Sequence, residues 1–231
     1  MGEKHHRWQA LNVRKVLILV EGQTEERFVK DVLQPLLWTR GIHPEPKIVT
    51  TKLVKVGPQF KGGVSTFRKI ETDICRLLGD SDAALVTTMF DYYGLPDDFP
   101  GGQDLRGRNS LERAKELEAA LEKHLDRGPK FLAYLMIHEF EALLFSSPSI
   151  LAQVMNAPTY GSRLQAIRGQ FSTPEDINDA PATTPSRRVL DLFPGYRKRL
   201  HGSLTTGRIG LATIRRECSH FNEWVTKLER V

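Results

Sequence analysis

The stretch VLILVEGQTEERFV, residues 16–29, decides the fold. Residues 16–20 are five consecutive apolar residues, which is typical of a strand buried on both faces of a parallel sheet. A polar turn follows, and Thr24 is suited to cap a helix whose first turn holds Glu25 and Glu26. Apolar residues then recur at helical spacing, and Pro35 predicts a kink or an early end. The stretch therefore predicts a buried strand, a turn and a helix.

The same alternation of strand and helix continues to about residue 148. Further strands are predicted at 48–56, 83–90 and 131–137. Helices are predicted at 66–78, at 110–125 with a Ser110 cap, and from 138 to 147. Such alternation indicates an α/β fold, with a mostly parallel four-stranded sheet flanked by helices.

The character of the chain changes at about residue 149. Short helices are predicted at 149–157 and 163–171, then a polar loop with several prolines at 172–188, and a helical tail at 209–229. We therefore expect two domains: an α/β domain at 1–148, and a mainly helical C-terminal extension at 149–231 packed on it.

Charge gives a weak indication of the partner. The chain of 231 residues has a formal net charge of +5 and a sequence pI of about 9.2. Between Arg187 and Arg216 there are eight Lys and Arg residues and a single acid, Asp191. Such a segment can follow a phosphate backbone, although solvated helix faces have the same composition.

Several classes of protein are disfavoured. Cys75 and Cys218 are the two cysteines, and neither a disulfide framework nor a zinc-ligand spacing is present. No segment approaches the ~20 apolar residues that span a bilayer, and the first residues lack a signal-peptide pattern. The chain has no Walker A motif and no G-x-S-x-G elbow. We expect a cytoplasmic protein with no membrane association.

Acidic residues follow three of the predicted strands. These are Glu21, Asp91, and the pair Glu139 and Glu141. Parallel strands bring such residues to the same edge of the sheet, where ligands bind in open α/β folds. Converging carboxylates require a raised pKa or a cation, and Mg²⁺ prefers oxygen ligands. The sequence therefore predicts a carboxylate site for Mg²⁺ or Mn²⁺, or for a proton that has to be moved.

Each acid also has a structural interpretation. Glu21, Glu25 and Glu26 would favour the N-terminus of the following helix, and Asp91 suits a turn. Glu139 and Glu141 would point in different directions on one regular helix, so we expect one of them to face the site. His138 is expected to support or cap rather than to bind a metal ion, and Asp97 and Asp98 are expected to be exposed.

Six motifs resemble the DUF4276 family of bacterial proteins, from about Lys15 to the end. They are VEGQTEERFV, DYYGLPDDFPG, IHEFEALLFS, PEDINDAPATTPSRR, GYRKRLHG and RIGLATIRRECSHFNEWV. The first half of the family is similar to Toprim domains, the metal-binding catalytic modules of topoisomerases, primases and OLD-type nucleases. The resemblance therefore implies a Toprim-like fold.

The Toprim pattern has a glutamate after the first strand and Asp-x-Asp after the third. Glu21 and Asp91 match, but Tyr93 stands where the second aspartate is expected. Glu141 resembles a Phe-Glu motif that follows the fourth strand in some Toprim proteins of phage defence. The resemblance implies catalysis and metal binding by Glu21, Asp91 and Glu141, with Glu25 or Glu139 in support. Because Tyr93 replaces the second aspartate, the site could bind one metal ion, bind two, or be inactive.

Three functions remain open. The first is a metal-dependent phosphodiesterase or nuclease of a bacterial defence or mobile-element module. Its phosphate contacts would be Arg187, Arg188, Lys198, His201 and Arg208, and a separately encoded ABC/SMC-like ATPase is the implied partner. The second is a catalytically inactive regulatory or binding subunit of such an ATPase. The third is phosphoryl chemistry on a small nucleotide or a modified RNA.

Overall fold

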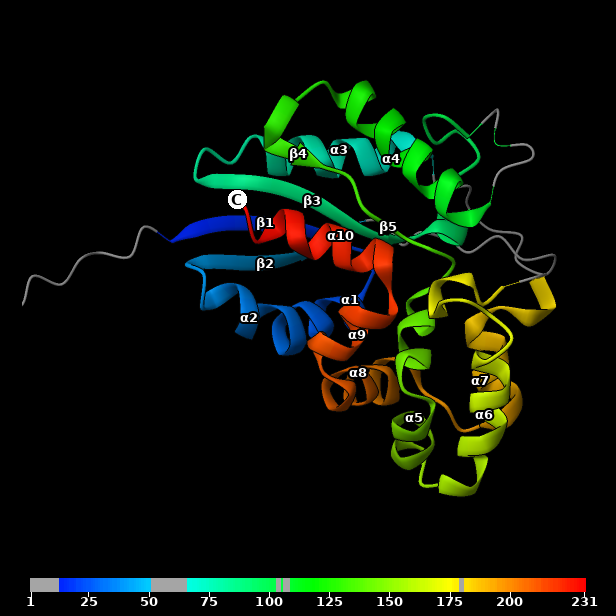
Figure 1. Cartoon of the computed structure of the whole chain (residues 1–231). Coiled ribbons are helices and arrows are strands. Elements are labelled where there is room, and N and C mark those ends of the chain that lie inside the picture. The colour runs from blue at the N-terminus through cyan, green and yellow to red at the C-terminus, as the bar shows by residue number, and fades with distance from the viewer. Residues whose placement is uncertain (1–12, 51–65, 103–104, 106–108, 179–180) are drawn as a thin grey trace, which may run out of the picture.

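A parallel sheet forms the centre of the molecule (Figure 1). The computed structural model describes residues 13–50, 66–102, 105, 109–178 and 181–231. The strand order is β2-β1-β3-β4, β5 also pairs with β3, and each of these pairs is parallel. The strands are β1 (Arg14–Val20), β2 (Ile42–Ile48), β3 (Ala83–Asp91), β4 (Phe131–Leu132) and β5 (Leu135–Met136). The predicted α/β class with a mostly parallel sheet is confirmed.

Helices cover both faces of the sheet (Figure 1). In the first half they are α1 (Gln23–Phe28), α2 (Gln34–Trp38), α3 (Phe67–Leu78) and α4 (Ser110–Leu125). In the second half they are α5 (Pro148–Val154), α6 (Gly161–Arg168), α7 (Pro185–Leu192), α8 (Ser203–Ile209), α9 (Leu211–Glu217) and α10 (Ser219–Leu228).

Strand β1 is buried on both faces because its side chains alternate between two hydrophobic clusters. Val16, Ile18 and Val20 pack in the cluster that contains α1, α2, α9 and α10. Leu17 and Leu19 pack in the cluster that contains α3 and α4. The five residues are 0–2% exposed, which fits the continuous apolar run of a central parallel strand.

The sequence pattern missed strand β2, Ile42–Ile48. The strand predicted at 48–56 falls mostly on residues 51–65, which lie outside the described residues. Pro44 and Pro46 explain why β2 was missed, because proline is unfavourable within a sheet. They are tolerated because β2 lies at the end of the strand order in the described part of the chain, where outward-facing N–H groups need no strand partner.

The fourth strand, predicted as one run at 131–137, consists of β4 and β5 with a break between them. The hydroxyl of Thr88 causes the break: it accepts from the Tyr134 N–H and donates to the Tyr134 carbonyl, both at 2.9 Å. On the outer side, Glu122 accepts from the Ala133 N–H at 2.9 Å and Glu118 accepts from the Leu135 N–H at 2.8 Å. Side chains thus replace part of the backbone ladder.

Helix starts also differ from the prediction. Asn109, not Ser110, caps α4, and it forms a reciprocal capping box with Glu112. Thr24 does not cap α1; Gly22 holds that position. Pro35 lies in the first turn of α2, after a π-helical segment at Val29–Leu33. The helix predicted at 138–147 is a 3-10 helix, Phe140–Ser146.

The C-terminal helix α10 packs on the sheet. The Trp224 indole of α10 donates to the Thr87 hydroxyl at 3.0 Å, and its ring stacks on Tyr134 at 4.4 Å. The larger hydrophobic cluster contains residues from both halves of the chain, such as Val16 and Trp224. The division into domains at residue 148 stays a prediction.

Candidate active site

Three of the predicted acids meet at the carboxyl ends of β1 and β3. Glu21 follows β1 directly, and its carboxylate accepts from the Asp91 N–H at 2.7 Å. Asp91, the last residue of β3, accepts from the Phe140 N–H at 2.9 Å at the start of the 3-10 helix that carries Glu141. Asp91 is 1% exposed and Glu141 is 2% exposed. Asp91 therefore ties the ends of two strands to the segment bearing the third acid.

A lysine from the second half of the chain joins these acids. The Lys198 ammonium lies 3.2 Å from Glu25, 3.4 Å from Asp91 and 3.5 Å from Glu141. We call Glu21, Glu25, Asp91 and Glu141 the acid cluster. Burial lowers the pKa of Lys198, but the surrounding carboxylates outweigh it and hold that pKa well above its ordinary value. Lys198 is thus a counter-ion of the acid cluster in the protein itself, and the phosphate contact predicted for it stays a prediction.

Small residues and a tyrosine complete the wall of the cluster. The Tyr196 hydroxyl donates to Glu141 at 3.5 Å. A Cβ at Gly202 would come within 3.1 Å of that hydroxyl, and a Cβ at Gly94 within 3.1 Å of the Glu21 carboxylate. The sequence analysis missed Tyr196, Gly94 and Gly202. Two of them lie beside Lys198 in the motif GYRKRLHG, which was the available signal.

The carboxyl group of Glu21 has a raised pKa. Burial, and after it the charge of Asp91, raise the pKa of Glu21 to about 8, although Lys198 acts in the opposite direction. Its carboxyl group is thus able to take up and release a proton near neutral pH.

The raised pKa of Glu21 makes stability depend on pH. The folded state binds this proton more tightly than the unfolded state, whose pKa is near 4.5. The stabilisation is fully present below pH 4.5 and is lost as the pH rises through about 8. We expect the free energy of unfolding in urea to fall by roughly 2–3 kcal/mol between about pH 5.5 and 8.5. Glu21→Gln should remove that fall; an identical pH slope in the variant would contradict this account.

Glu139 forms a hydrogen bond with α7 instead of with the acid cluster. Its carboxylate accepts from the Ser186 N–H at 2.9 Å, in the first turn of α7, where negative charge is favoured. Glu26 lies on the surface side of α1 and pairs with Lys30 at 2.6 Å. Each of these acids therefore has a structural partner of its own.

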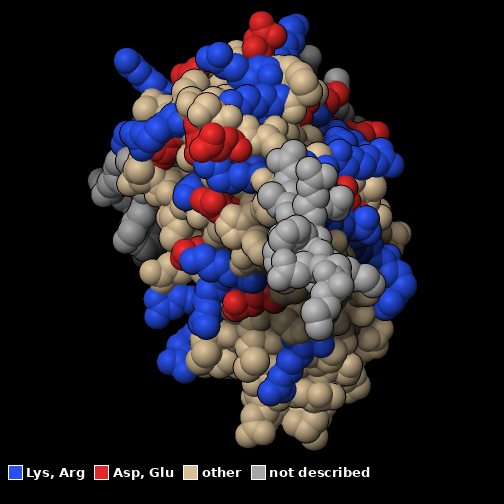
Figure 2. All heavy atoms as spheres, turned by 90° about the vertical axis from the view of Figure 1, so that its left-hand side faces the viewer, with Lys and Arg blue, Asp and Glu red and all other residues tan. Residues whose placement is uncertain are grey.

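The other basic candidates lie on several elements. Arg187 pairs with Asp191 at 3.1 Å, and Arg188 stacks over Phe171 and donates to the Thr183 carbonyl. His201 accepts from the Arg197 N–H at 2.9 Å, and burial lowers its pKa. Arg208 lines a cavity of about 300 Å³ between α1 and α8. At the amino ends of the strands, Figure 2 shows Lys and Arg interspersed with Asp and Glu. Contact of these residues with phosphates stays a prediction.

His138 and Tyr93 form a stacked pair beside the acid cluster. The rings are 5.3 Å apart with an interplanar angle of 18°. His138 is 1% exposed, and its backbone has a positive φ of 68°, which is uncommon outside glycine. Burial lowers the pKa of His138 to about 4, so the imidazole is neutral. A buried, neutral imidazole is consistent with the expectation that His138 supports neighbouring residues and does not bind a metal ion.

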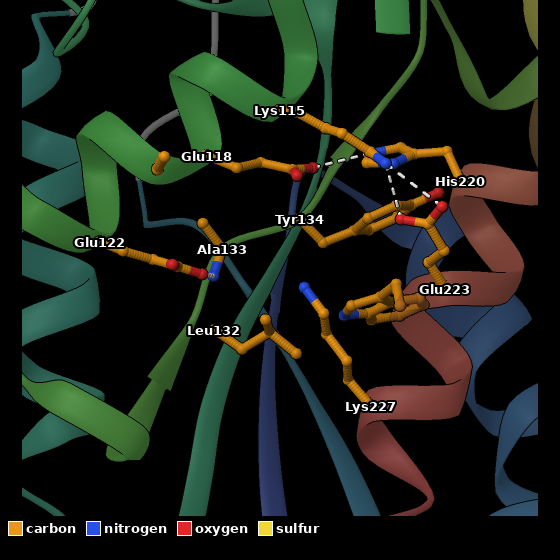
Figure 3. A pocket seen from close by; sticks show the side chains of 11 residues that line it. Lys115, Glu118, Glu122, Leu132, Ala133, Tyr134, His220, Glu223 and Lys227 are labelled. Carbon is orange, nitrogen blue, oxygen red and sulfur yellow. Dashed lines mark hydrogen bonds and ion pairs between the residues drawn. The ribbon is translucent and has the colours of Figure 1, made fainter. Parts of the chain in front are cut away.

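A separate cavity of about 260 Å³ lies between α4 and α10 (Figure 3). Glu118 pairs with His220 across it at 2.8 Å, and Lys115 pairs with Glu223 at its rim. Glu118 also holds the Leu135 N–H. None of the acid-cluster residues lines this cavity.

Groups of metal ligands and membrane-spanning helices are both absent from the described residues as they are arranged here. No group of three or more His, Cys, Asp and Glu side chains there is arranged to hold a metal ion, and Lys198 occupies the space between the acids instead. Across the same part of the chain, the helices are too short or too polar to cross a membrane.

The chain is similar to two solved structures. No curated protein matches the chain. Among solved structures it is similar to the C-terminal region of the Burkholderia pseudomallei OLD protein, with 14% identity, a TM-score of 0.43, and coverage of 93% of this chain and 98% of that chain. It is also similar to the C-terminal region of the Xanthomonas campestris pv. campestris OLD protein, with 19% identity, a TM-score of 0.37, and coverage of 94% and 98%.

The family assignment rests on a match over most of the chain. Residues 20–229 match the family model described as "Domain of unknown function (DUF4276)". The range includes the acid cluster and Lys198. The chain belongs to the DUF4276 family.

Proposed function

We propose that the protein is a Toprim-like, metal-dependent phosphodiesterase that acts on nucleic acid. The observation that carries the proposal is the acid cluster itself: buried carboxylates at the carboxyl ends of two parallel strands, gathered around a cationic group. Ligands of open α/β sheets bind at this edge. The match of Glu21 and Asp91 to the Toprim pattern supports the same reading.

In the metal-free protein Lys198 occupies the space between the acids, but the chemistry of the donor set suits a hard divalent cation. Four acidic side chains act on the Lys198 ammonium, more than one lysine can neutralise. Mg²⁺ and Mn²⁺ favour such oxygen ligands. Asp91 and Glu141 would hold the ion, with Glu25 in support, and Glu21 beside them would keep its proton for transfer; Glu139 is left out because it binds α7. Bound there, the ion supplies activation of water and stabilisation of the leaving oxygen.

The chain's own residues then have separate tasks. Glu21 exchanges a proton with the attacking water or the leaving group, because its pKa of about 8 suits neutral pH. Lys198 neutralises the acids in the metal-free protein, and its ammonium would be available to bind a phosphate oxygen of the substrate. Tyr196 orients Glu141 through its hydroxyl. Defence against phage and a separately encoded ATPase partner are the proposed setting.

One observation favours a second candidate, an inactive regulatory subunit. Lys198 already neutralises part of the cluster, and Tyr93 stands where the Toprim pattern has a second aspartate. In that case the acid cluster and Lys198 would form a structural ion network.

The test combines calorimetric titration of Mn²⁺ and Mg²⁺ with cleavage of labelled DNA and RNA. Wild type is expected to bind metal and to cleave in its presence, whereas Asp91→Asn should do neither. Asp31→Asn is the matched control, because Asp31 is an exposed acid paired with Arg27 on the surface. Metal binding without cleavage, with and without an ATPase partner, would favour the regulatory subunit. Equal behaviour of both variants would remove Asp91 from the site.

A further inference from the structure

Tyr93 is an aromatic ring held in place at the protein surface. It is 49% exposed, among the most exposed large apolar side chains in the described part of the chain. One face of the ring stacks on the buried His138. Tyr92 forms a T-shaped pair with it at a centroid distance of 5.5 Å. A half-exposed ring adds little to the core, so burial alone does not explain its position.

The polar contacts of Tyr93 fix the orientation of this ring. The Asn178 side chain bonds to its hydroxyl, and the Tyr93 N–H donates to the His138 carbonyl at 3.4 Å. Beneath it, His138 adopts the positive φ that places the imidazole parallel to the phenol. The buried His138, with its uncommon backbone conformation, thus supports the exposed ring of Tyr93. Uncommon backbone conformations are enriched at functional sites.

Tyr93 lies close to the acid cluster along the chain. Asp91 ends β3, and a short 3-10 turn at Tyr92–Gly94 follows. Gly94 packs against Glu21 so closely that a Cβ there would lie 3.1 Å from the carboxylate. In the chain, Tyr93 therefore lies between Asp91, which belongs to the acid cluster, and Gly94, which packs against Glu21.

A cavity adjoins the ring. It has a volume of about 310 Å³ and is lined by Tyr92 and Tyr93 together with the loop Leu95–Gly102 and Leu117 of α4. The hydroxyl of Tyr93 is turned to Asn178, so this residue does not replace the missing metal ligand. What it offers instead is a π-face and an open space next to it.

We propose that Tyr93 is a stacking platform for an unpaired nucleobase, which makes single-stranded nucleic acid the substrate class of the acid cluster. This inference rests on the proposed function. Bases stack on aromatic side chains regardless of sequence, because every base has a π-face. In an intact duplex both faces of an internal base are already stacked. A base seated on Tyr93 would place its neighbouring phosphate toward Glu21 and Asp91.

The experiment measures stacking without cleavage. A single-stranded DNA 12-mer with one 2-aminopurine is titrated with wild type, Tyr93→Ala, Tyr93→Leu and Tyr93→Phe in low salt with EDTA. Wild type and Tyr93→Phe are expected to bind and to quench the fluorescence, since both keep the aromatic face. Tyr93→Ala and Tyr93→Leu should bind on the order of tenfold more weakly and lose the quenching. Thermal melting of each variant confirms that it is folded.

The outcomes separate this proposal from the proposed function. Equal binding and quenching by all four proteins would overturn the platform while leaving phosphodiesterase activity intact. Binding of duplex alone, or no binding of nucleic acid by wild type, would overturn the proposal as well. Glu21→Gln is included in the titration. If it binds the 12-mer as wild type does, but wild type cleaves nothing with Mn²⁺, the platform stands and the proposed cleavage fails.

Discussion

Glu21→Gln is expected to lower nucleic-acid cleavage by at least ~100-fold, because it removes the group that moves the proton. The variant keeps the shape of the site, since a glutamine oxygen can still accept from the Asp91 N–H. It also removes a charge that burial and Asp91 disfavour. The variant should therefore be at least as stable as wild type near pH 8, and a loss of activity would not reflect unfolding. The measurement is the single-turnover cleavage rate with Mn²⁺.

Glu26→Gln is the matched control for this prediction. Glu26 lies five residues further along the chain and forms a surface pair with Lys30. Its replacement is expected to leave the cleavage rate within about twofold of wild type, since surface pairs contribute little. A Glu21→Gln variant that cleaves at the wild-type rate would show that Glu21 serves the fold alone.

Lys198→Met is expected to destabilise the metal-free protein by roughly 3 kcal/mol at neutral pH. The change leaves Glu25, Asp91 and Glu141 close together without their ammonium, and each of these acids is 1–3% exposed. For a chain of this size the loss corresponds to a fall in melting temperature of about 6–12 °C. The measurement is thermal melting of both proteins in EDTA.

Two further conditions test the cause of that loss. Acidic conditions lessen the negative charge that is left without its ammonium, and Mn²⁺ supplies the missing positive charge, so each should narrow the difference in melting temperature. Lys30→Met, which breaks the surface pair with Glu26, is expected to change the melting temperature by less than about 2 °C. A Lys198→Met deficit that does not respond to pH or metal would point to lost packing instead.

The sequence predicted the parts of the site that depend on strand order. The apolar run at residues 16–20 and the strand that ends at Asp91 were both confirmed, and they bring Glu21 and Asp91 together. The prediction succeeded because a buried parallel strand leaves a continuous apolar signal and ends in a known direction.

The remaining parts depend on contacts that leave no periodic signal. Glu139 binds α7 and Glu141 lies near Lys198, and the positive φ of His138 just before them is a backbone conformation that no periodic pattern predicts. Lys198 reaches the cluster from 107 residues beyond Asp91. The sequence around Lys198 shows a basic segment, but it does not show which acidic groups Lys198 pairs with. The fourth strand breaks because of the Thr88 hydroxyl, which pattern reasoning treats as an ordinary strand residue.

The backbone N–H groups on the outer side of β4 and β5 affect whether a strand of another molecule can pair there. The N–H groups of Ala133 and Leu135 are bonded to the carboxylates of Glu122 and Glu118, one turn apart on α4. A strand from another molecule could pair here only by displacing both carboxylates, so this border of the sheet resists strand addition and the aggregation that can follow from it. A partner that docks on this side must recognise the side chains of α4 and α10.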